Sequence, residues 1–251
     1  MWGLTSTGIN YTDLWKLKVS KKEADTIFKD ISRIFPKHVF FEEKHGVGQK
    51  TLFDVLKCIS LVFKETGYVQ AMVYIASVLL MYMNEEDAFW TMVSIMSKYD
   101  QKKYYVQSMG GVWESFYILQ KFIELKMPKL HQHMLESKIT PSMYATQWFM
   151  TLFTTGFEFE CTVRIYDSFF AEGPKILFRV ALFILKNNQA KLLKADLGEF
   201  FDILRQFYAT TSADKLIDGA VDIDITREQI AEFETEYHSD PDQAIFTFMK
   251  G

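Results

Sequence analysis

The chain has 251 residues, of which 49% are hydrophobic, 24% charged and 16% aromatic, and its formal net charge is −4 at pH 7. So much apolar surface excludes an intrinsically disordered chain, and the slight excess of acidic residues excludes a broad basic face for nucleic acid. The chain's 12 glycines and 5 prolines are too few for an all-β sandwich with many tight turns, and its 2 cysteines are too few for a disulfide framework or a four-thiolate zinc site.

Helix signals follow one another through the first half of the chain. Ser20 and Glu23 form a capping-box pattern, which predicts a helix over Lys21–Ile34. Pro36 ends this helix, because the residue before a proline disfavours the helical conformation. Apolar residues at helical spacing predict three further helices, over Lys50–Lys64, Tyr68–Met83 and Met92–Tyr105, and Asn84 is expected to cap a helix after the second of these.

The second half of the chain continues in the same way. A helix is expected around Val112–Leu125, and Thr140 with Pro141 predicts the start of another. Two last short helices are expected to open at Thr226, with Gln229 as its partner, and at Asp240–Pro241. The sequence therefore predicts an all-α protein with two helical lobes, residues 1–138 and residues 139–251.

No segment of the sequence has the features of a membrane span. The longest apolar stretch, Met72–Met83, is shorter than the ~20 residues that a helix needs to cross a bilayer. The N-terminal stretch Met1–Tyr11 lacks the basic and then apolar pattern of a signal peptide. We therefore expect a cytoplasmic protein with no transmembrane segment.

Several patterns in the sequence resemble catalytic or metal sites, but none of them is a good candidate for such a site. Residues 48–51 read G-Q-K-T, but they lack the spacing of a phosphate-binding loop, in which lysine directly follows glycine. His131 and His133 would point about 200° apart on a helix, so they make a poor metal site. Cys58 and Cys161 stand in apolar surroundings and are expected to pack as small hydrophobic side chains.

Two short segments in the first half carry a family resemblance. Residues 24–41 read A-D-T-I-F-K-D-I-S-R-I-F-P-K-H-V-F-F, and residues 67–72 read G-Y-V-Q-A-M. The first resembles the I-x-x-D-x-x-R signature of the TBC domains, a family of Rab GTPase-activating proteins, with its trailing F-P-x-H. The second resembles the Y-x-Q signature of the same family. Flanking segments are also similar, at residues 46–49 (G-V-G-Q), 85–90 (E-E-D-A-F-W) and 147–149 (Q-W-F).

The resemblance implies a fold and a mechanism. It implies two packed α-helical subdomains that form a V-shaped domain with a cleft. It implies that Arg33 acts as an arginine finger and Gln70 as a glutamine finger on a bound Rab-family GTPase. The partner would bring GTP and Mg²⁺, so the chain would need no cofactor, carry out no reaction alone, and be recruited to endomembranes through the GTPase. Supporting or partner-contact roles would fall to Asp30, Tyr68, Phe35, Pro36, His38, Gln147 and Trp148.

The spacing of the first signature is compatible with these roles. Ile27, Asp30 and Arg33 would lie within about 120° on one side of a helix, with Ile27 against the core. We expect the Asp30 carboxylate to hold Arg33 or the neighbouring backbone. Tyr68 is expected to pack beside Gln70 or to bond the arginine.

The sequence also departs from the family pattern at several positions. Trp2 resembles a tryptophan of the family's opening segment, and Ala71 and Ile34 stand where glycine and threonine are common. Two other functions remain open at this point. One is a catalytically inactive TBC-like adaptor that binds a Rab, and the other is an α-solenoid scaffold without a GTPase partner.

Overall fold

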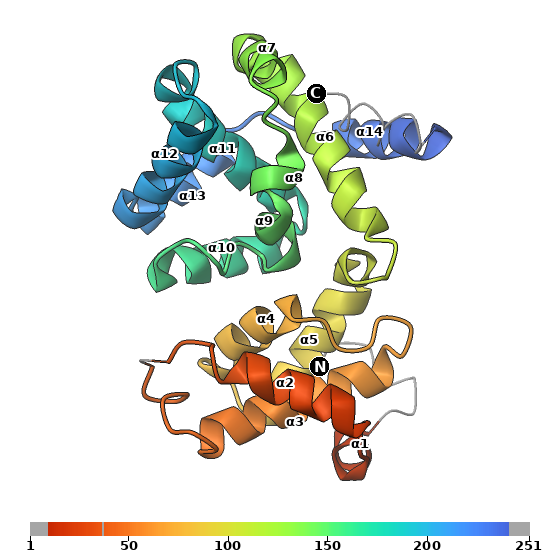
Figure 1. The fold of residues 1–251 in the computed structure, drawn as a ribbon. Helices are drawn as coiled ribbons and strands as arrows, with labels where there is room; N and C mark the ends of the chain where they lie inside the picture. Colours follow the sequence, from red (N-terminus) through yellow and green to blue (C-terminus); the bar gives the residue numbers. More distant parts are fainter. Residues whose placement is uncertain (1–9, 37, 241–251) are drawn as a thin grey trace. The chain divides into compact units, whose positions relative to one another are not determined.

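The computed structural model describes residues 10–36 and 38–240, which form helices joined by loops and turns (Figure 1). No β-strand occurs among these described residues, so the prediction of an all-α fold is confirmed. The chain divides into two compact units, Met1–Ser108 and Met109–Gly251. The predicted helix at Asp240–Pro241 and the position of Trp2 depend on residues outside the described ranges.

The division between the units differs from the expected one near residue 138. Lys138 lies in the short connection between α7 (Pro128–Glu136) and α8 (Pro141–Tyr144). Both of these helices pack against α6 (Gly110–Lys126), which also packs against later helices of the second unit. Because α6 joins the two sides of Lys138, the chain around that residue belongs to one unit.

The first unit is built around α3, a helix buried on most of its circumference. The Leu52, Val55 and Ile59 side chains of α3 are fully buried, and the helix contacts α1, α2, α4 and α5. Figure 1 shows α2 and α3 side by side in the red and orange part of the ribbon. The helices of this unit are α1 (Tyr11–Lys16), α2 (Lys21–Ile31), α3 (Val47–Val62), α4 (Ala71–Leu80), α5 (Glu85–Ser97) and the 3₁₀ helix η2 (Gln101–Tyr104).

The second unit is built around α11, which packs against α6, α9, α10, α12 and α13. Aromatic rings fill much of its core; Phe149 and Phe178, for example, have ring centroids 5.2 Å apart. Besides α6, α7 and α8, the unit contains α9 (Thr146–Met150), α10 (Phe159–Glu172), α11 (Lys175–Leu192), α12 (Leu197–Thr210), α13 (Ala213–Val221) and α14 (Arg227–Ser239).

Helices that the sequence opens with a capping pattern, such as α2 and α14, begin at the predicted residues, whereas α4 begins at Ala71, three residues after its predicted start. Ser20 caps α2 by accepting a hydrogen bond from the Glu23 amide at 3.2 Å. At the start of α14, Thr226 and Gln229 form the expected capping box. The end of α2 differs from the prediction, because the helix stops at Ile31 and the chain continues to Ile34 as turns. In these tighter turns each backbone hydrogen bond joins residues three apart, so the α-helical hydrogen-bond pattern is not continued.

Two further findings concern the absence of sites and spans in the described part of the chain. No helix there combines the length and the apolar character that crossing a membrane requires. No group of three or more His, Cys, Asp or Glu side chains there is arranged to hold a metal ion. His133 instead makes a contact of 3.0 Å through its Nε2 atom with the Ala195 carbonyl oxygen.

We predict that neither cysteine of the native protein reacts with a thiol reagent. Burial raises the pKa of Cys58 to about 12, and its side chain is fully buried in α3. Burial also raises the pKa of Cys161, which is 2% exposed. Since the thiolate is the reactive form, Ellman's reagent at pH 8 should release almost no chromophore from the folded protein and two equivalents after guanidinium denaturation. Rapid stoichiometric reaction of the folded protein would contradict this packing.

Candidate functional site

A hydrogen bond joins the two signature segments within the first unit. The Tyr68 hydroxyl donates to Oδ2 of Asp30 at 3.0 Å. Asp30 is the penultimate residue of α2 and is only 8% exposed, while Tyr68 lies in the loop between α3 and α4. Burial, and then the negative charge of Asp30, raise the pKa of Tyr68, so the phenol remains a donor at neutral pH. The bond ties the loop before α4 to the end of α2.

Arg33 lies two residues beyond α2, with its side chain exposed to solvent. Its backbone amide donates to the Asp30 carbonyl at 3.0 Å, and its neighbours Ile31 and Ile34 are buried. Within the described ranges, no hydrogen bond or ion pair engages the Arg33 guanidinium. Of the alternatives expected for Asp30 and Tyr68, binding of this guanidinium is not seen, because the two side chains bind each other.

Gln70 is also exposed and directly precedes α4. Its carbonyl accepts from the Val73 amide at 3.2 Å, and its side chain does not cap the helix. Gly67, three residues earlier, has φ of +60°, a conformation that glycine adopts without steric cost. The next residue, Ala71, is 7% exposed, so the methyl group that stands in the place of the family's glycine is buried.

The segment after Arg33 folds into a series of turns. Phe35 has φ of +39°, which is uncommon for a residue with a side chain. The His38 amide donates to the Phe35 carbonyl at 2.9 Å, and the His38 Nδ1 atom accepts from the Phe40 amide at 3.3 Å. The His38 side chain therefore orders the loop from within, whereas Pro36 is exposed.

Two residues at the start of α3 hold the other end of this loop. A Cβ atom on Gly48 would lie 1.7 Å from the Phe40 carbonyl oxygen, so only glycine fits there. Gln49 is 9% exposed, and its Nε2 donates to the Phe41 carbonyl at 2.8 Å. Sequence reasoning assigned Gln49 no role. The available signals were the family-like segment G-V-G-Q at residues 46–49 and a polar side chain next to a glycine at a helix start.

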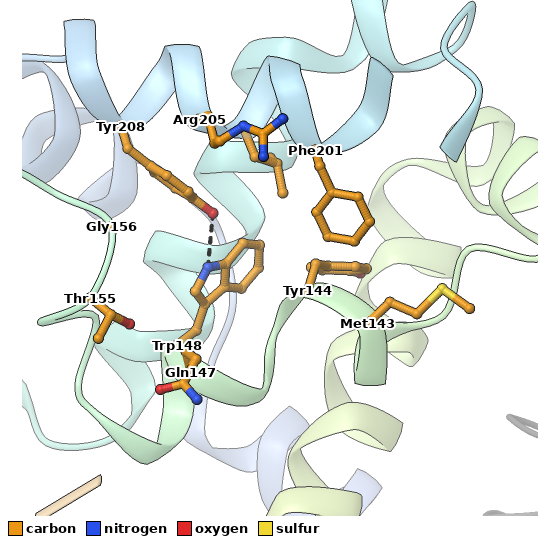
Figure 2. A pocket seen from close by; sticks show the side chains of 10 residues that line it. Met143, Tyr144, Gln147, Trp148, Thr155, Gly156, Phe201, Arg205 and Tyr208 are labelled. Atoms are coloured by element: carbon orange, nitrogen blue, oxygen red, sulfur yellow. Dashed lines mark hydrogen bonds between the residues drawn. The ribbon is translucent and has the colours of Figure 1, made fainter. Parts of the chain in front are cut away.

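The last two candidate residues, Gln147 and Trp148, belong to the second unit. Trp148 is 3% exposed and donates through its indole nitrogen to the Tyr208 hydroxyl at 2.9 Å (Figure 2). Its ring also stacks on Phe153. Gln147 is exposed at a surface pocket of about 230 Å³, which Trp148 and Tyr208 also line. Trp148 is thus a packing residue of this unit, and Gln147 is the more accessible of the pair.

Comparison with known proteins places these features in a family context. The family model described as "Rab-GTPase-TBC domain" matches residues 5–193. The chain is 36% identical over 232 residues to the human "Ecotropic viral integration site 5 protein homolog", covering 90% of this chain and 28% of that protein. It is 33% identical to mouse "TBC1 domain family member 4", covering 91% of this chain and 18% of that protein. The chain thus spans less than a third of the length of either relative.

Solved structures show the same fold. The Chlamydomonas flagellar RabGAP TBC domain has a TM-score of 0.76 and 31% identity, and the match covers 87% of this chain and 75% of that one. The Ypt/Rab-GAP domain of Gyp1p has a TM-score of 0.69 over 90% of this chain and 79% of that one. At 15% identity, the second similarity supports the fold alone.

We predict that Tyr68→Phe destabilises the first unit. The substitution removes the hydroxyl donor and leaves a buried Asp30 carboxylate oxygen without its partner. Leaving a buried acceptor unsatisfied costs about 1–3 kcal/mol, and more when the group is charged. Urea unfolding followed by circular dichroism should show a lower midpoint, and Asp30→Asn, which keeps an acceptor, should lower it less. An unchanged midpoint for Tyr68→Phe would show that the bond contributes little to stability.

Proposed function

The chain belongs to the Rab-GTPase-TBC domain family, and on that premise we propose that it accelerates GTP hydrolysis by a Rab-family small GTPase. The observation that carries the proposal is the Tyr68–Asp30 hydrogen bond, which joins the segments bearing Arg33 and Gln70 within one unit. Both of these side chains are exposed, as residues that reach into a partner's nucleotide site must be.

In this proposal Arg33 stabilises the charge that develops during hydrolysis. Water attacks the γ-phosphorus of GTP, the bond from that phosphorus to the β–γ bridging oxygen breaks, and GDP and phosphate result. Negative charge spreads over the phosphoryl and leaving oxygens in the transition state. A guanidinium is always charged and carries several donors in a planar fork, so it can neutralise this charge where a lysine or an amide does so less well.

Gln70 would act on the attacking water. A side-chain amide has both an acceptor and donors, so it can hold a water in line with the bond that breaks while contacting the γ-phosphoryl group. The position of Gln70 beside a helix start, with its amide uncommitted to capping, leaves that side chain available to a partner.

The Asp30 carboxylate matters to this mechanism because it lies three residues from Arg33. A carboxylate paired with the finger would cancel part of its charge and would have to be displaced when the GTPase binds. The Tyr68 hydroxyl donates a hydrogen bond to Oδ2 of Asp30. Among the described residues no carboxylate forms an ion pair with the guanidinium, so its donors are available to phosphate oxygens.

The partner would supply the remaining components. GTP and Mg²⁺ would arrive with the Rab-family protein, and the chain would add side chains without a cofactor of its own. Recruitment from the cytoplasm to an endomembrane would follow from binding the GTPase there.

We predict that Arg33→Ala lowers the stimulated turnover of GTP by about 10³- to 10⁵-fold, the range seen for arginine fingers. That range corresponds to about 4–7 kcal/mol of barrier. Gln70→Ala should also lower turnover strongly, and both variants should keep the parent's melting temperature because the two side chains are exposed. Single-turnover phosphate release across a panel of Rab proteins measures this, with Arg164→Ala, an exposed arginine of the second unit, as the matched control.

Two results would oppose the catalytic role. One is the absence of stimulation with every Rab tested, and the other is an Arg33→Ala protein as active as the parent. Binding to a GTP-loaded Rab without stimulation would instead indicate a non-catalytic adaptor.

A further inference from the structure

The loop between α2 and α3, described at residues 32–36 and 38–46, carries Arg33 at its beginning and is attached at its far end to a buried amide. We propose that Gln49 is a positioning residue for Arg33, acting through the backbone of this loop. The inference rests on the proposed function, because it concerns the placement of the arginine finger.

Gln49 uses both ends of its side-chain amide on the loop. Its Nε2 donates to the Phe41 carbonyl at 2.8 Å, and its Oε1 accepts from the His45 amide at 3.0 Å. The side chain is 9% exposed, and its bond to the Phe41 carbonyl is buried and so shielded from water. A carboxylate would lose the donor and an apolar side chain would lose both bonds, so an amide at this position satisfies the two backbone groups together.

Backbone hydrogen bonds continue from this clamp towards Arg33. The Phe41 amide donates to the His38 carbonyl at 2.8 Å, and the His38 amide donates to the Phe35 carbonyl at 2.9 Å. Phe35 is two residues after Arg33. Successive bonds therefore lead from the Gln49 amide to the immediate neighbourhood of the finger.

Phe35 needs this support because of its conformation. Its φ of +39° lies in the left-handed region, and it precedes Pro36, which restricts the residue before it further. Such a conformation persists only where surrounding contacts fix it. When the Gln49 clamp is removed, we expect the turns at Phe35 to relax and the direction of Arg33 to change.

Gly48 gives a second, separate contact between α3 and the same loop. Its α-carbon lies so close to Phe40 that a Cβ atom would be 1.7 Å from the carbonyl oxygen. The loop backbone is thus pressed against the start of α3 at Phe40, and Gln49 bonds the next residue, Phe41. Neighbouring loop residues are therefore held by neighbouring helix residues, which makes a rigid attachment.

The test uses Gln49→Met, which keeps the length of the side chain and loses both hydrogen bonds. We expect kcat of the stimulated reaction to fall about tenfold or more, since small misplacements of a catalytic group are costly, while KM for the GTP-loaded Rab changes less than about twofold, as expected when only transition-state contacts weaken. Gln49→Glu, which keeps only the acceptor for His45, should also lower kcat. Asn188→Leu removes a buried amide of the second unit and should leave kcat unchanged.

A double-mutant comparison separates positioning from general loss of stability. In an Arg33→Ala background, Gln49→Met should cause no further loss of kcat, because the group that it positions is already absent. The assays are run at a temperature where circular dichroism shows every variant folded.

Three results would overturn the inference. The first is that Gln49→Met and Gln49→Glu both keep the parent's kcat. The second is that Gln49→Met lowers kcat by the same factor in the parent and in the Arg33→Ala protein. In both cases an inactive Arg33→Ala protein leaves the proposed function standing. If Arg33→Ala alone is fully active, the proposed function fails, and the inference fails with it.

Discussion

The hydrogen bond from the Tyr68 hydroxyl to the Asp30 carboxylate is the interaction on which the rest of the site depends. The two residues are 38 positions apart in sequence, and all of α3 lies between them. A buried carboxylate is costly unless it is paired, and a buried phenol needs an acceptor, so each group stabilises the other only when the loop before α4 lies against the end of α2. The bond therefore fixes the backbone positions of Arg33 and Gln70, whose side chains are exposed, relative to each other.

Some polar groups of this region are bound within the chain and build the site, while others remain available to a partner. Asp30 is occupied by Tyr68, and Gln49 is occupied by the backbone of the loop that follows Arg33. These buried groups keep the local backbone in place. In a site that acts by electrostatic stabilisation, donors held in advance avoid the cost of reorganising at the moment of reaction.

The sequence predicted the features that follow from local rules. Capping by Ser20 and the Thr226 box were foreseeable because a short polar side chain satisfies amides at a helix start. The end of α2 and the unit boundary were not, since turns after Ile31 and the packing of α6 across Lys138 depend on tertiary contacts. For the same reason the sequence did not predict the bond between Asp30 and Tyr68, and it left Gln49 without a role. The exposure of Arg33 and Gln70 agrees with the expectation that neither belongs to the core, while their catalytic roles stay predictions.

The central claim is that Arg33 and Gln70 act together on one nucleotide, and binding to a transition-state analogue tests it most directly. The measurement is the affinity of the parent and of the Arg33→Ala and Gln70→Ala proteins for a Rab carrying GDP alone or GDP with aluminium fluoride, which mimics the phosphoryl group in transfer. We predict that the parent binds the aluminium fluoride form at least 10²-fold more tightly than the GDP form, the lower end for transition-state analogues, and that each substitution removes most of this preference. Equal affinity of the parent for the two forms, or a preference that survives in Arg33→Ala, would contradict the account.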